Sequence, residues 1–544
     1  MTSKVAVLLF IPYILSASAG NVYVTPTGGS TGSCPAGSTT FTASQFNSPT
    51  NWGAGSMQIG PGTNVLVCGT FTFSSGGSGL IPQGSGTSGN PIIITLESGA
   101  ILQAPYFGAP SGLAAGCSGS CPAGISIVEQ NYITVDGQNS GLIQDTDNGT
   151  LKTNHQSSAG LFASGDHILI KRLVIDHIYD QVNNGSNDTA GINTVGIFID
   201  SGSTNVEICG STSNHAHTGI QVFASHGVSV DGPDLCNGTQ AATGVNIHHN
   251  TLNQHVWHIE VNSVGRLNVY SNELQTYTDW NTSNDFYHLD GIIVFSGSAG
   301  QALPYIYNNY AHGDMGANGT GTIFCTYGVA GTGSACTIFN NILVGEGTSQ
   351  GSVCCQAGEW HHSADGHSLG PHFTYNNTFV GFSRQYFQDG DSSQVYTVEN
   401  NVFDSLDASN TYYINGVSTP LANVTSDYNV FYNGRTAGPL VLQSTFYVFA
   451  TWQSAGKDIH GAQQNPTLDS SYHLQGGSPA IGIGINLSSN CLANGGDIPN
   501  ALCADKASIP RPASGPWDIG AYQYTVPGNA FFSGAVTTSG QVLH

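Results

Sequence analysis

Short apolar runs alternate with polar positions along most of the chain, and a polar turn follows each run. From about residue 125 to 435 these turns often contain asparagine, as in "VNIHHNTL" (245–252), "YIYNNYAH" (305–312) and "FTYNNTFV" (373–380). The runs have the length and alternation of β-strands. Asparagine suits the turns because it tolerates the left-handed backbone conformation. The pattern predicts many short strands and little helix.

The asparagine turns recur at irregular intervals of roughly 20 to 40 residues. A regular motif with variable spacing is typical of a right-handed parallel β-helix, because each coil adds short strands to stacked sheets while its loops vary in length. We also expect asparagine amides to bond from one coil to the next. A β-sandwich is the structural alternative, but it rarely needs about 300 residues of such turns. The predicted fold class is therefore all-β, a parallel β-helix.

The chain begins with a segment typical of a secretory signal peptide, because Lys4 precedes the apolar run "VAVLLFIPYILSA" and small residues follow it. We predict a signal peptide over 1–19 and a secreted protein. The apolar run is shorter than the roughly 20 residues that cross a bilayer, so no membrane insertion is expected. The remaining chain divides into an N-terminal cap with first coils (20–125), a coil core with groove-forming loops (126–435), and last coils with a C-terminal cap (436–544).

Acidic residues dominate the charge of the chain. Ten Lys and Arg stand against 33 Asp and Glu, which gives a formal net charge of −23. Nucleic acids and anionic membranes require clustered positive charge, so neither is an expected partner. An anionic glycan stays open, because Ca²⁺ held by surface carboxylates could bridge to it. An acidic surface that only confers solubility fits the composition equally well, and we expect a monomer.

Twelve cysteines occur in this exported chain, and most have a near neighbour in sequence. Local disulfides are the simplest interpretation. The expected pairs are Cys34 with Cys68, Cys117 with Cys121, Cys209 with Cys236, Cys325 with Cys336, and Cys491 with Cys503. The adjacent Cys354 and Cys355 form either a vicinal bridge or bonds to Cys325 and Cys336. No His and Cys spacing indicates zinc, and Ca²⁺ is the only cofactor left open.

The two ends of the chain carry recognisable segments. These are "YVTPTGG" near the start, "NPTLDSSYHLQGGSPAIGIGIN" at 465–486 and "RPASGPWDIGAYQY" at 511–524. With them the chain resembles secreted bacterial right-handed β-helix proteins of the pectin-lyase-like superfamily. The resemblance implies the fold but no activity, since the superfamily includes lyases, hydrolases, epimerases, spikes and adhesins. An aspartate pair followed by "RIK" and an arginine-rich signature are absent, which argues against galacturonan hydrolases and pectate lyases.

Three successive coils align on one inward isoleucine each, in "HAHTGIQVF" (215–223), "HVWHIEVNS" (255–263) and "HLDGIIVFS" (288–296). Strand alternation then places His258 and Glu260 on the outer face, two residues apart. Glycines occupy the positions of His258 in the coils before and after. We therefore expect both side chains to be reachable by solvent.

Neighbouring coils add further polar and aromatic side chains to this face. The predicted catalytic residues are Glu260, Asp290, His258 and His288. The predicted substrate-binding residues beside them are His217 and Trp257. Carboxylates and histidines transfer protons, and an aromatic ring can stack on a sugar, so the set is typical of a glycan site. Taken singly, an outward histidine or glutamate is usually only solvated.

A second polar stretch, "GEWHHSADGH" at 358–367, contains Glu359, Trp360 and His362. We predict that these three side chains line the far wall of the same groove. The alternative is an ordinary polar loop, because no stacked partner supports the segment.

The favoured function is an extracellular polysaccharide-active enzyme that cleaves a glycan bound along the outside of the solenoid. A glycoside hydrolase, with Glu260 and Asp290 as acid and base, is preferred because Lys and Arg are scarce. A polysaccharide lyase is the close alternative, with a His or Tyr base and a cation such as Ca²⁺. A non-catalytic adhesin or matrix protein is the alternative of another class, because the chain contains no compact catalytic motif.

Overall fold

The structure is a computed structural model, and it describes most of the chain. The described residues are 20–526 except for 32–33, 35–38, 110–120, 182–193, 224–243, 263–266, 278–288, 297–303, 314–318, 328–335, 346–356, 363–370, 383–384, 390–394, 406–411, 417–419, 433–439, 443–444 and 494–500. The predicted signal peptide lies outside them. None of the described helices is long and apolar enough to cross a membrane.

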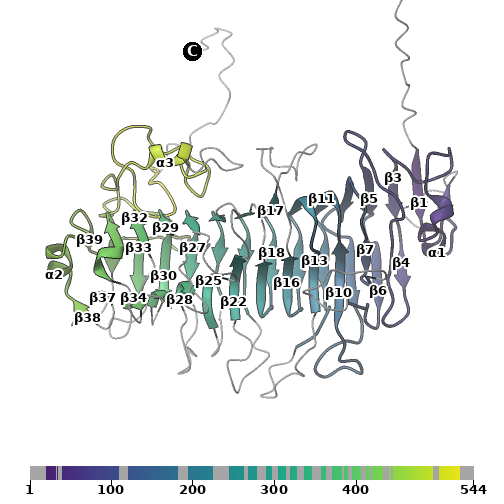
Figure 1. Cartoon of the computed structure of the whole chain (residues 1–544), viewed down its shortest axis with the longest axis horizontal. Coiled ribbons are helices and arrows are strands. Elements are labelled where there is room, and N and C mark those ends of the chain that lie inside the picture. The colour runs from purple at the N-terminus through teal and green to yellow at the C-terminus, as the bar shows by residue number, and fades with distance from the viewer. Residues whose placement is uncertain are drawn as a thin grey trace, which may run out of the picture.

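Three long parallel sheets run side by side along the molecule (Figure 1). We name them sheet A, sheet B and sheet C, and among the described residues they contain 14, 10 and 13 strands, respectively. A coil passes through one strand of sheet B, then of sheet A, then of sheet C, as in β10 (Ser158–Ala163), β11 (Asp166–Lys171) and β12 (Val174–Asp176). This arrangement confirms the predicted parallel β-helix.

The strands are short and, from β1 onward, stack in chain order. Sheet A contains, in spatial order, β2 (Thr40–Phe41), β1 (Asn21–Val24), β3 (Asn64–Val67), β5 (Ile92–Leu96), β8 (Ile133–Asp136), β11, β14 (Thr204–Cys209), β17 (Val245–His248), β20 (Leu267–Tyr270), β23 (Tyr305–Tyr307), β26 (Thr337–Phe339), β29 (His372–Tyr375), β32 (Tyr396–Glu399) and β35 (Val424–Asp427).

Sheets B and C follow the same stacking. Sheet B contains β7 (Ile125–Ile127), β10, β13 (Thr194–Ile199), β16 (Thr218–Phe223), β19 (Trp257–Asn262), β22 (Leu289–Ser296), β25 (Gly319–Tyr327), β28 (Ala357–His362), β31 (Gln385–Asp389) and β34 (Tyr412–Gly416). Sheet C contains β4 (Thr70–Thr72), β6 (Ile101–Ala104), β9 (Leu142–Asp145), β12, β15 (Thr212–Asn214), β18 (Thr251–Asn253), β21 (Glu273–Leu274), β24 (Tyr310–Ala311), β27 (Ile342–Val344), β30 (Thr378–Phe382), β33 (Val402–Ser405), β36 (Val430–Tyr432) and β39 (Ala462–Gln463).

Helices are few and short in the part of the chain that the structure describes. They are α1 (Ala43–Phe46), α2 (Phe449–Ser454) and α3 (Ser488–Ala493), with the 3₁₀ turns η1 (Pro49–Asn51) and η3 (Leu421–Asn423). A hairpin of β37 (Leu440–Leu442) and β38 (Thr445–Tyr447) lies near α2. In Figure 1, α1 lies at the N-terminal end of the solenoid and α2 at the opposite end. Both solenoid ends are therefore flanked by a short helix.

Buried asparagines connect the coils at the bend between sheets A and C. Each accepts a hydrogen bond from the side-chain amide of the one before it, at 3.0 to 3.2 Å. The ladder runs through Asn250, Asn272, Asn309, Asn341, Asn377, Asn401 and Asn429, and ends at Asp458. The predicted bonding of asparagine amides between coils is confirmed.

The left-handed residue of each bend is the one just before the ladder asparagine. Asn308, Asn340, Asn376 and Asn400 have φ values of 52° to 61°. In doubled bends such as "NN", the first asparagine therefore supplies the backbone geometry and the second supplies the ladder. This division of roles explains why the two occur together.

The C-terminal segment packs across the outer face of sheet A, where α3 lies over the end of that sheet in Figure 1. It covers a row of stacked rings, in which Tyr270 and Tyr307 are 4.9 Å apart. Arg511 donates to the side-chain oxygen of Asn340 at 3.0 Å, and Asn376 donates to the carbonyl of Asp518 at 3.0 Å. The "RPASGPWDIGAYQY" stretch thus caps the sheet through the left-handed asparagines.

Three of the predicted disulfides are present among the described residues. They join Cys34 with Cys68, Cys325 with Cys336, and Cys491 with Cys503. The alternative that Cys354 and Cys355 bond to Cys325 and Cys336 is therefore wrong. Cys121 and Cys209 are also disulfide-bonded. Their predicted partners, Cys117 and Cys236, lie outside the described residues, as do Cys354 and Cys355.

Candidate functional site

The three aligned coils stack in the predicted register within sheet B. Ile220 pairs with Ile259, and Ile259 with Ile292, and all three side chains are buried in the main core. One residue further along, Gln221, Glu260 and Ile293 form the neighbouring row. The alignment therefore located the strands of the candidate site correctly.

Glu260 projects from the outer face of sheet B. The next two members of its row, Ile293 and Phe324, belong to an apolar cluster separate from the main core. On the other side, Nε2 of Gln221 donates to Oε2 of Glu260 at 2.5 Å. Glu260 is thus a carboxyl group between an amide and an apolar surface.

The expectation that Glu260 is freely reachable by solvent is wrong, because only 5% of the residue is exposed. This burial raises the pKa of Glu260 to about 7, and the hydrogen bond from Gln221 partly offsets the rise. A carboxyl group with such a pKa is partly protonated near neutral pH. It can therefore donate a proton, as an exposed glutamate at that pH cannot.

The prediction that His258 faces outward is wrong, since its side chain is fully buried. Its ring centroid lies 4.3 Å from that of Tyr277 and 5.5 Å from that of His255. The stacked position in the next coil is Gly291, where an added Cβ would lie 2.7 Å from Oη of Tyr277 and 3.3 Å from the core residue Leu274. His258 therefore points into the corner between sheets B and C. Burial holds its pKa well below the ordinary value of histidine.

The reason for this error is a break in strand alternation. His258 and Ile259 both face inward, so the outward positions on either side are Trp257 and Glu260. The same break occurs three coils earlier, where a Cβ on Gly160 would lie 2.7 Å from the core residue Ile175 although the following Leu161 is also in the core. Inward and outward residues do not alternate strictly across a corner of the solenoid. The orientation of a side chain there cannot be derived from alternation in the sequence alone.

Asp290 and Trp257 share the outward row that precedes the bend. Asp290 is directly beside Trp257 in register and is fully buried. The hydroxyl of Thr320 and the backbone amide of Gly321 both donate to its Oδ1, the latter at 3.0 Å. Asp290 is thus bonded to the coil after it, whereas Glu260 is bonded to the coil before it. The two carboxylates share a face without forming a close pair.

Trp257 lies against His217, as predicted, with ring centroids 5.0 Å apart and ring planes nearly perpendicular. Trp257 is half-buried, and its indole packs against two apolar clusters that are separate from the main core. His217 is only 4% exposed, and burial lowers its pKa to about 3. The imidazole is therefore neutral at ordinary pH and can serve as a hydrogen-bonding group rather than a cation.

The second polar stretch is a strand, and one of its residues is misplaced by the prediction. Glu359 occupies the inward isoleucine row, next to Ile323, and is fully buried. The expectation that Glu359 lines a groove is wrong, because the segment continues sheet B as β28. Trp360 and His362 are register partners of Phe324 and Thr326. Their side chains, and His288, lie outside the described part of the structure.

A surface hollow of about 390 Å³ lies at the bend beneath the C-terminal segment, and the sequence analysis missed it. Its lining includes Glu273, Tyr310, Lys506 and Tyr522. The amine of Lys506 donates to the carbonyl of Asn308, and burial lowers the pKa of Lys506 to about 8. No sequence signal joins Lys506 to the coil residues of the lining, because Lys506 is 198 positions from Asn308 along the chain.

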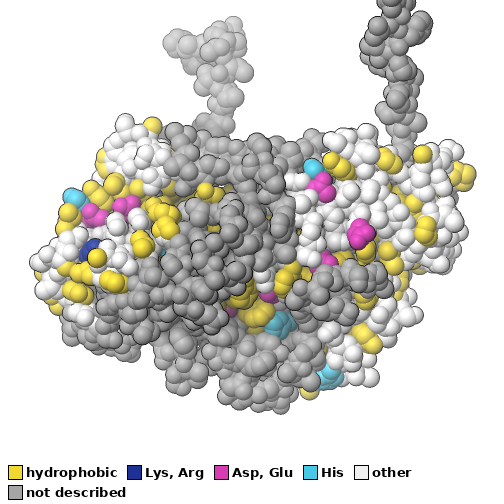
Figure 2. All heavy atoms as spheres, in the orientation of Figure 1, with side chains coloured by type: hydrophobic (Ala, Val, Ile, Leu, Met, Phe, Trp, Pro, Cys, Tyr) yellow, Lys and Arg dark blue, Asp and Glu magenta, His cyan; other side chains and the backbone are white. Residues whose placement is uncertain are grey.

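Two groups of potential metal ligands occur among the described residues. Glu207, Cys209 and His248 form one, but Cys209 is disulfide-bonded and offers no thiolate. In that group Nε2 of His248 lies 2.9 Å from Oε1 of Glu207. The other group, Asp176, His177 and His215, is partly exposed. On the face drawn in Figure 2, acidic and histidine side chains are visible at several places among uncharged and apolar groups.

No family model matches the chain, and no curated protein matches its sequence. Solved structures with a similar course of the chain include pectate lyase Pel9A, with 15% identity, 94% of this chain and 97% of that chain covered, and a TM-score of 0.44. XylC in complex with xylose matches with 8% identity, 93% and 98% covered, and a TM-score of 0.48. A lacto-N-biosidase from Eubacterium ramulus matches with 13% identity, 82% and 67% covered, and a TM-score of 0.39. Such low values transfer no activity to this chain, so its function has to be argued from its own site.

Proposed function

We propose that this protein is a secreted, monomeric polysaccharide-active enzyme, and specifically a glycoside hydrolase that holds its glycan along the outer face of sheet B. The observation that carries the proposal is Glu260, a carboxyl group on that face with a pKa of about 7. Glycosidic oxygen is a poor leaving group until it is protonated, so a carboxylic acid that keeps its proton near neutral pH is what the reaction needs.

In this mechanism Glu260 donates its proton to the leaving oxygen. Gln221 holds the carboxyl group in one orientation through its 2.5 Å hydrogen bond, and Ile293 and Phe324 keep water from lowering the pKa. After bond cleavage the anionic Glu260 still accepts the hydrogen bond from Gln221. The amide therefore limits the rise in pKa and lets the proton leave.

Asp290 is the second carboxylate of the proposal, as the base that activates water. On the neighbouring strand β22, the register partner of Glu260 is Ile293, and Asp290 lies three residues before it. This offset places the Cα atoms of Glu260 and Asp290 roughly 11 Å apart. Retaining enzymes hold their carboxyl groups about 5.5 Å apart, and inverting enzymes about 6.5 to 9.5 Å apart. We propose inversion at the anomeric carbon, because the register offset and the separate hydrogen-bond partners of Asp290 and Glu260 do not make them the close carboxyl pair of a retaining enzyme.

Trp257 and His217 supply the sugar-binding surface beside the acid. An indole flanked by an imidazole offers an apolar plate and a polar edge, which are the two features that a pyranose ring requires. We assign the position of Trp360 to the same face, since it continues the row of Glu260. His288, which directly precedes β22 in the sequence, stays a proposed catalytic residue. His362 follows at the far end of β28.

The test is a screen of neutral and acidic polysaccharides with purified protein. Release of reducing ends without ultraviolet absorbance from an unsaturated product indicates hydrolysis. Both signals together indicate β-elimination. Glu260→Gln should remove reducing-end release and leave the folded protein intact. Reducing-end release that is unaffected by Glu260→Gln would overturn the assigned acid.

A polysaccharide lyase is a second candidate, favoured by the hollow around Lys506. An amine with a pKa of about 8 is partly neutral near pH 7 and can abstract a proton, and Tyr310 and Tyr522 offer rings for sugar stacking. This function requires the unsaturated product and should be lost in Lys506→Met but retained in Glu260→Gln. If neither product forms on any glycan, the protein is a non-catalytic adhesin or matrix component instead.

A further inference from the structure

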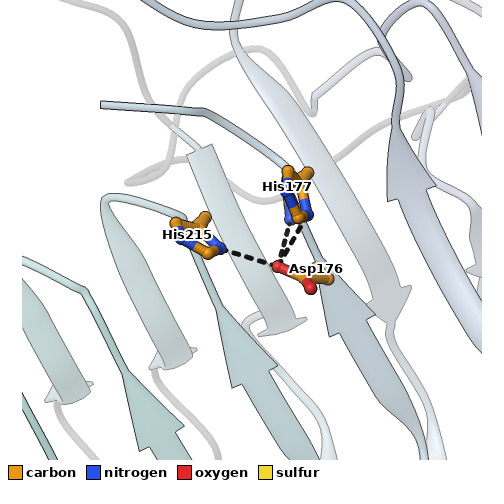
Figure 3. Close-up of side chains that lie close together, drawn as sticks. All are labelled: Asp176, His177 and His215. Carbon is orange, nitrogen blue, oxygen red and sulfur yellow. Dashed lines mark hydrogen bonds and ion pairs between the residues drawn. The ribbon is translucent and has the colours of Figure 1, made fainter. Parts of the chain in front are cut away.

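Three ligating side chains converge at the corner that follows sheet C. Asp176 is the last residue of β12, His177 follows it, and His215 follows β15 one coil later. Oδ1 of Asp176 lies 2.9 Å from Nδ1 of His177 and 2.7 Å from Nδ1 of His215 (Figure 3). Both imidazoles thus direct the same ring nitrogen at one carboxylate oxygen.

The stacking of coils fixes this convergence. Val174 of β12 pairs with Thr212 of β15, so the residues that follow the two strands lie one coil apart. His177 and His215 both adopt left-handed backbone angles, with φ values of 54° and 51°, and their ring centroids are 4.7 Å apart. The two imidazoles are therefore held side by side by the backbone rather than by a flexible loop.

The spacing of the three ligand atoms suits a small metal ion. All three lie within 4.8 Å of one another. In a tetrahedral zinc site with bonds of about 2.0 to 2.1 Å, ligand atoms are about 3.3 Å apart, so small side-chain rotations would admit an ion. The side chains of His177, His215 and Asp176 are 44%, 30% and 26% exposed, which leaves an entry path.

We propose that Asp176, His177 and His215 form a binding site for a divalent transition metal ion such as Zn²⁺, with the remaining coordination positions taken by water. Two imidazoles and one carboxylate match the ligand preference of zinc and its neighbours, whereas Ca²⁺ and Mg²⁺ prefer oxygen ligands throughout. Asp180, whose Oδ1 lies 3.8 Å from Nε2 of His177, is already paired with Lys152 at 2.9 Å, so the charge for the ion comes from Asp176. The site is independent of the proposed hydrolase function.

The experiment measures Zn²⁺ binding to the untagged, chelator-treated protein by equilibrium dialysis, with Ca²⁺ in excess. We expect a Zn²⁺ ion to bind in the presence of Ca²⁺, and Asp176→Asn and His215→Gln each to weaken this binding at least about 10-fold. Co²⁺ gives a second readout, since its visible absorption should appear with the natural protein and fade in both variants. Circular dichroism verifies that the variants are folded.

His460→Gln is the matched control. Nδ1 of His460 lies 2.8 Å from Oδ2 of Asp427, which is the same kind of pair without the second imidazole in the group. This variant should bind Zn²⁺ as the natural protein does. Absence of Zn²⁺ binding, or binding that Asp176→Asn and His215→Gln leave unchanged, would overturn the proposal and leave the three side chains as a hydrogen-bonded bend.

Discussion

Glu359 accepts a hydrogen bond from Thr374 inside the solenoid, with 2.9 Å between Oγ1 of the threonine and Oε2 of the glutamate. Thr374 belongs to the inward row of sheet A, where its neighbour is Ile338. Glu359 belongs to the inward row of sheet B, where its neighbour is Ile323. Each of the two polar residues stands where the preceding coil has an isoleucine. In this coil the core therefore contains a polar contact between sheets A and B in place of an apolar one.

The buried Glu359 should make stability depend on pH. Burial raises its pKa from 4.5 to about 8, so the folded state favours the protonated form. As pH rises from about 4.5 to 8, the unfolded chain releases this proton while the folded chain retains it, and the folded state loses stability. Glu359→Gln removes this loss, because the amide does not titrate.

We therefore expect the melting temperature of Glu359→Gln, relative to the natural protein, to rise steadily between pH 5 and pH 8. The difference in unfolding free energy should reach a few kcal/mol, on the order of 1.4 kcal/mol for each unit of pKa shift. Glu129→Gln, at an exposed position after β7, is the control and should show no such trend. Parallel pH profiles for Glu359→Gln and the natural protein would contradict the buried carboxyl group.

His258→Ala should destabilise the fold. The ring is fully buried and packs on Tyr277 and His255, so its removal leaves a cavity at the corner of the solenoid. Removal of large buried side chains typically costs about 2 to 5 kcal/mol. Urea denaturation should show a lower midpoint for this variant than for His155→Ala, which changes an exposed histidine. Equal midpoints would mean that His258 faces solvent after all.

Asn377→Ala should interrupt the asparagine ladder. Oδ1 of Asn377 accepts bonds from the backbone and side-chain amides of Asn341, and its Nδ2 donates to Asn401 and to the carbonyl of Ile338. The substitution leaves these buried groups unpaired, at a cost of about 1 to 3 kcal/mol for each group. We expect a clear fall in thermal stability.

Asn90→Ala is the comparison for the ladder variant. Asn90 is an exposed turn residue outside the ladder, and changes at such positions usually stay within about 0.5 kcal/mol. A ladder variant that melts together with Asn90→Ala would show that the ladder contributes little.

The fold could be predicted because its signals repeat. Asparagine bends recur in coil after coil, and the stacking of Ile220, Ile259 and Ile292 follows once those coils are aligned. The ladder itself follows from the side-chain chemistry of asparagine. One asparagine bend alone predicts little, but the repeated bends together predict how successive coils align in the sheets.

The site could be predicted only in part, because its features break the repetition. The corner turns His258 inward, and alternation alone gives no sign of such a bend. Glu359 replaces an isoleucine within a strand, although its polar neighbours in sequence indicate a loop. The convergence of Asp176 with His215 depends on the length of one coil, which the sequence does not reveal before the strands are placed.

The central claim is that Glu260 donates the proton in glycan cleavage. Its most direct test is the turnover of Glu260→Gln on the polysaccharide found by the screen, with Glu129→Gln as the control that also converts one glutamate to glutamine. The account predicts a loss of about 100-fold or more in kcat for Glu260→Gln without a lowered melting temperature, and full activity for Glu129→Gln. Full turnover of Glu260→Gln would contradict the account and direct attention to the hollow around Lys506.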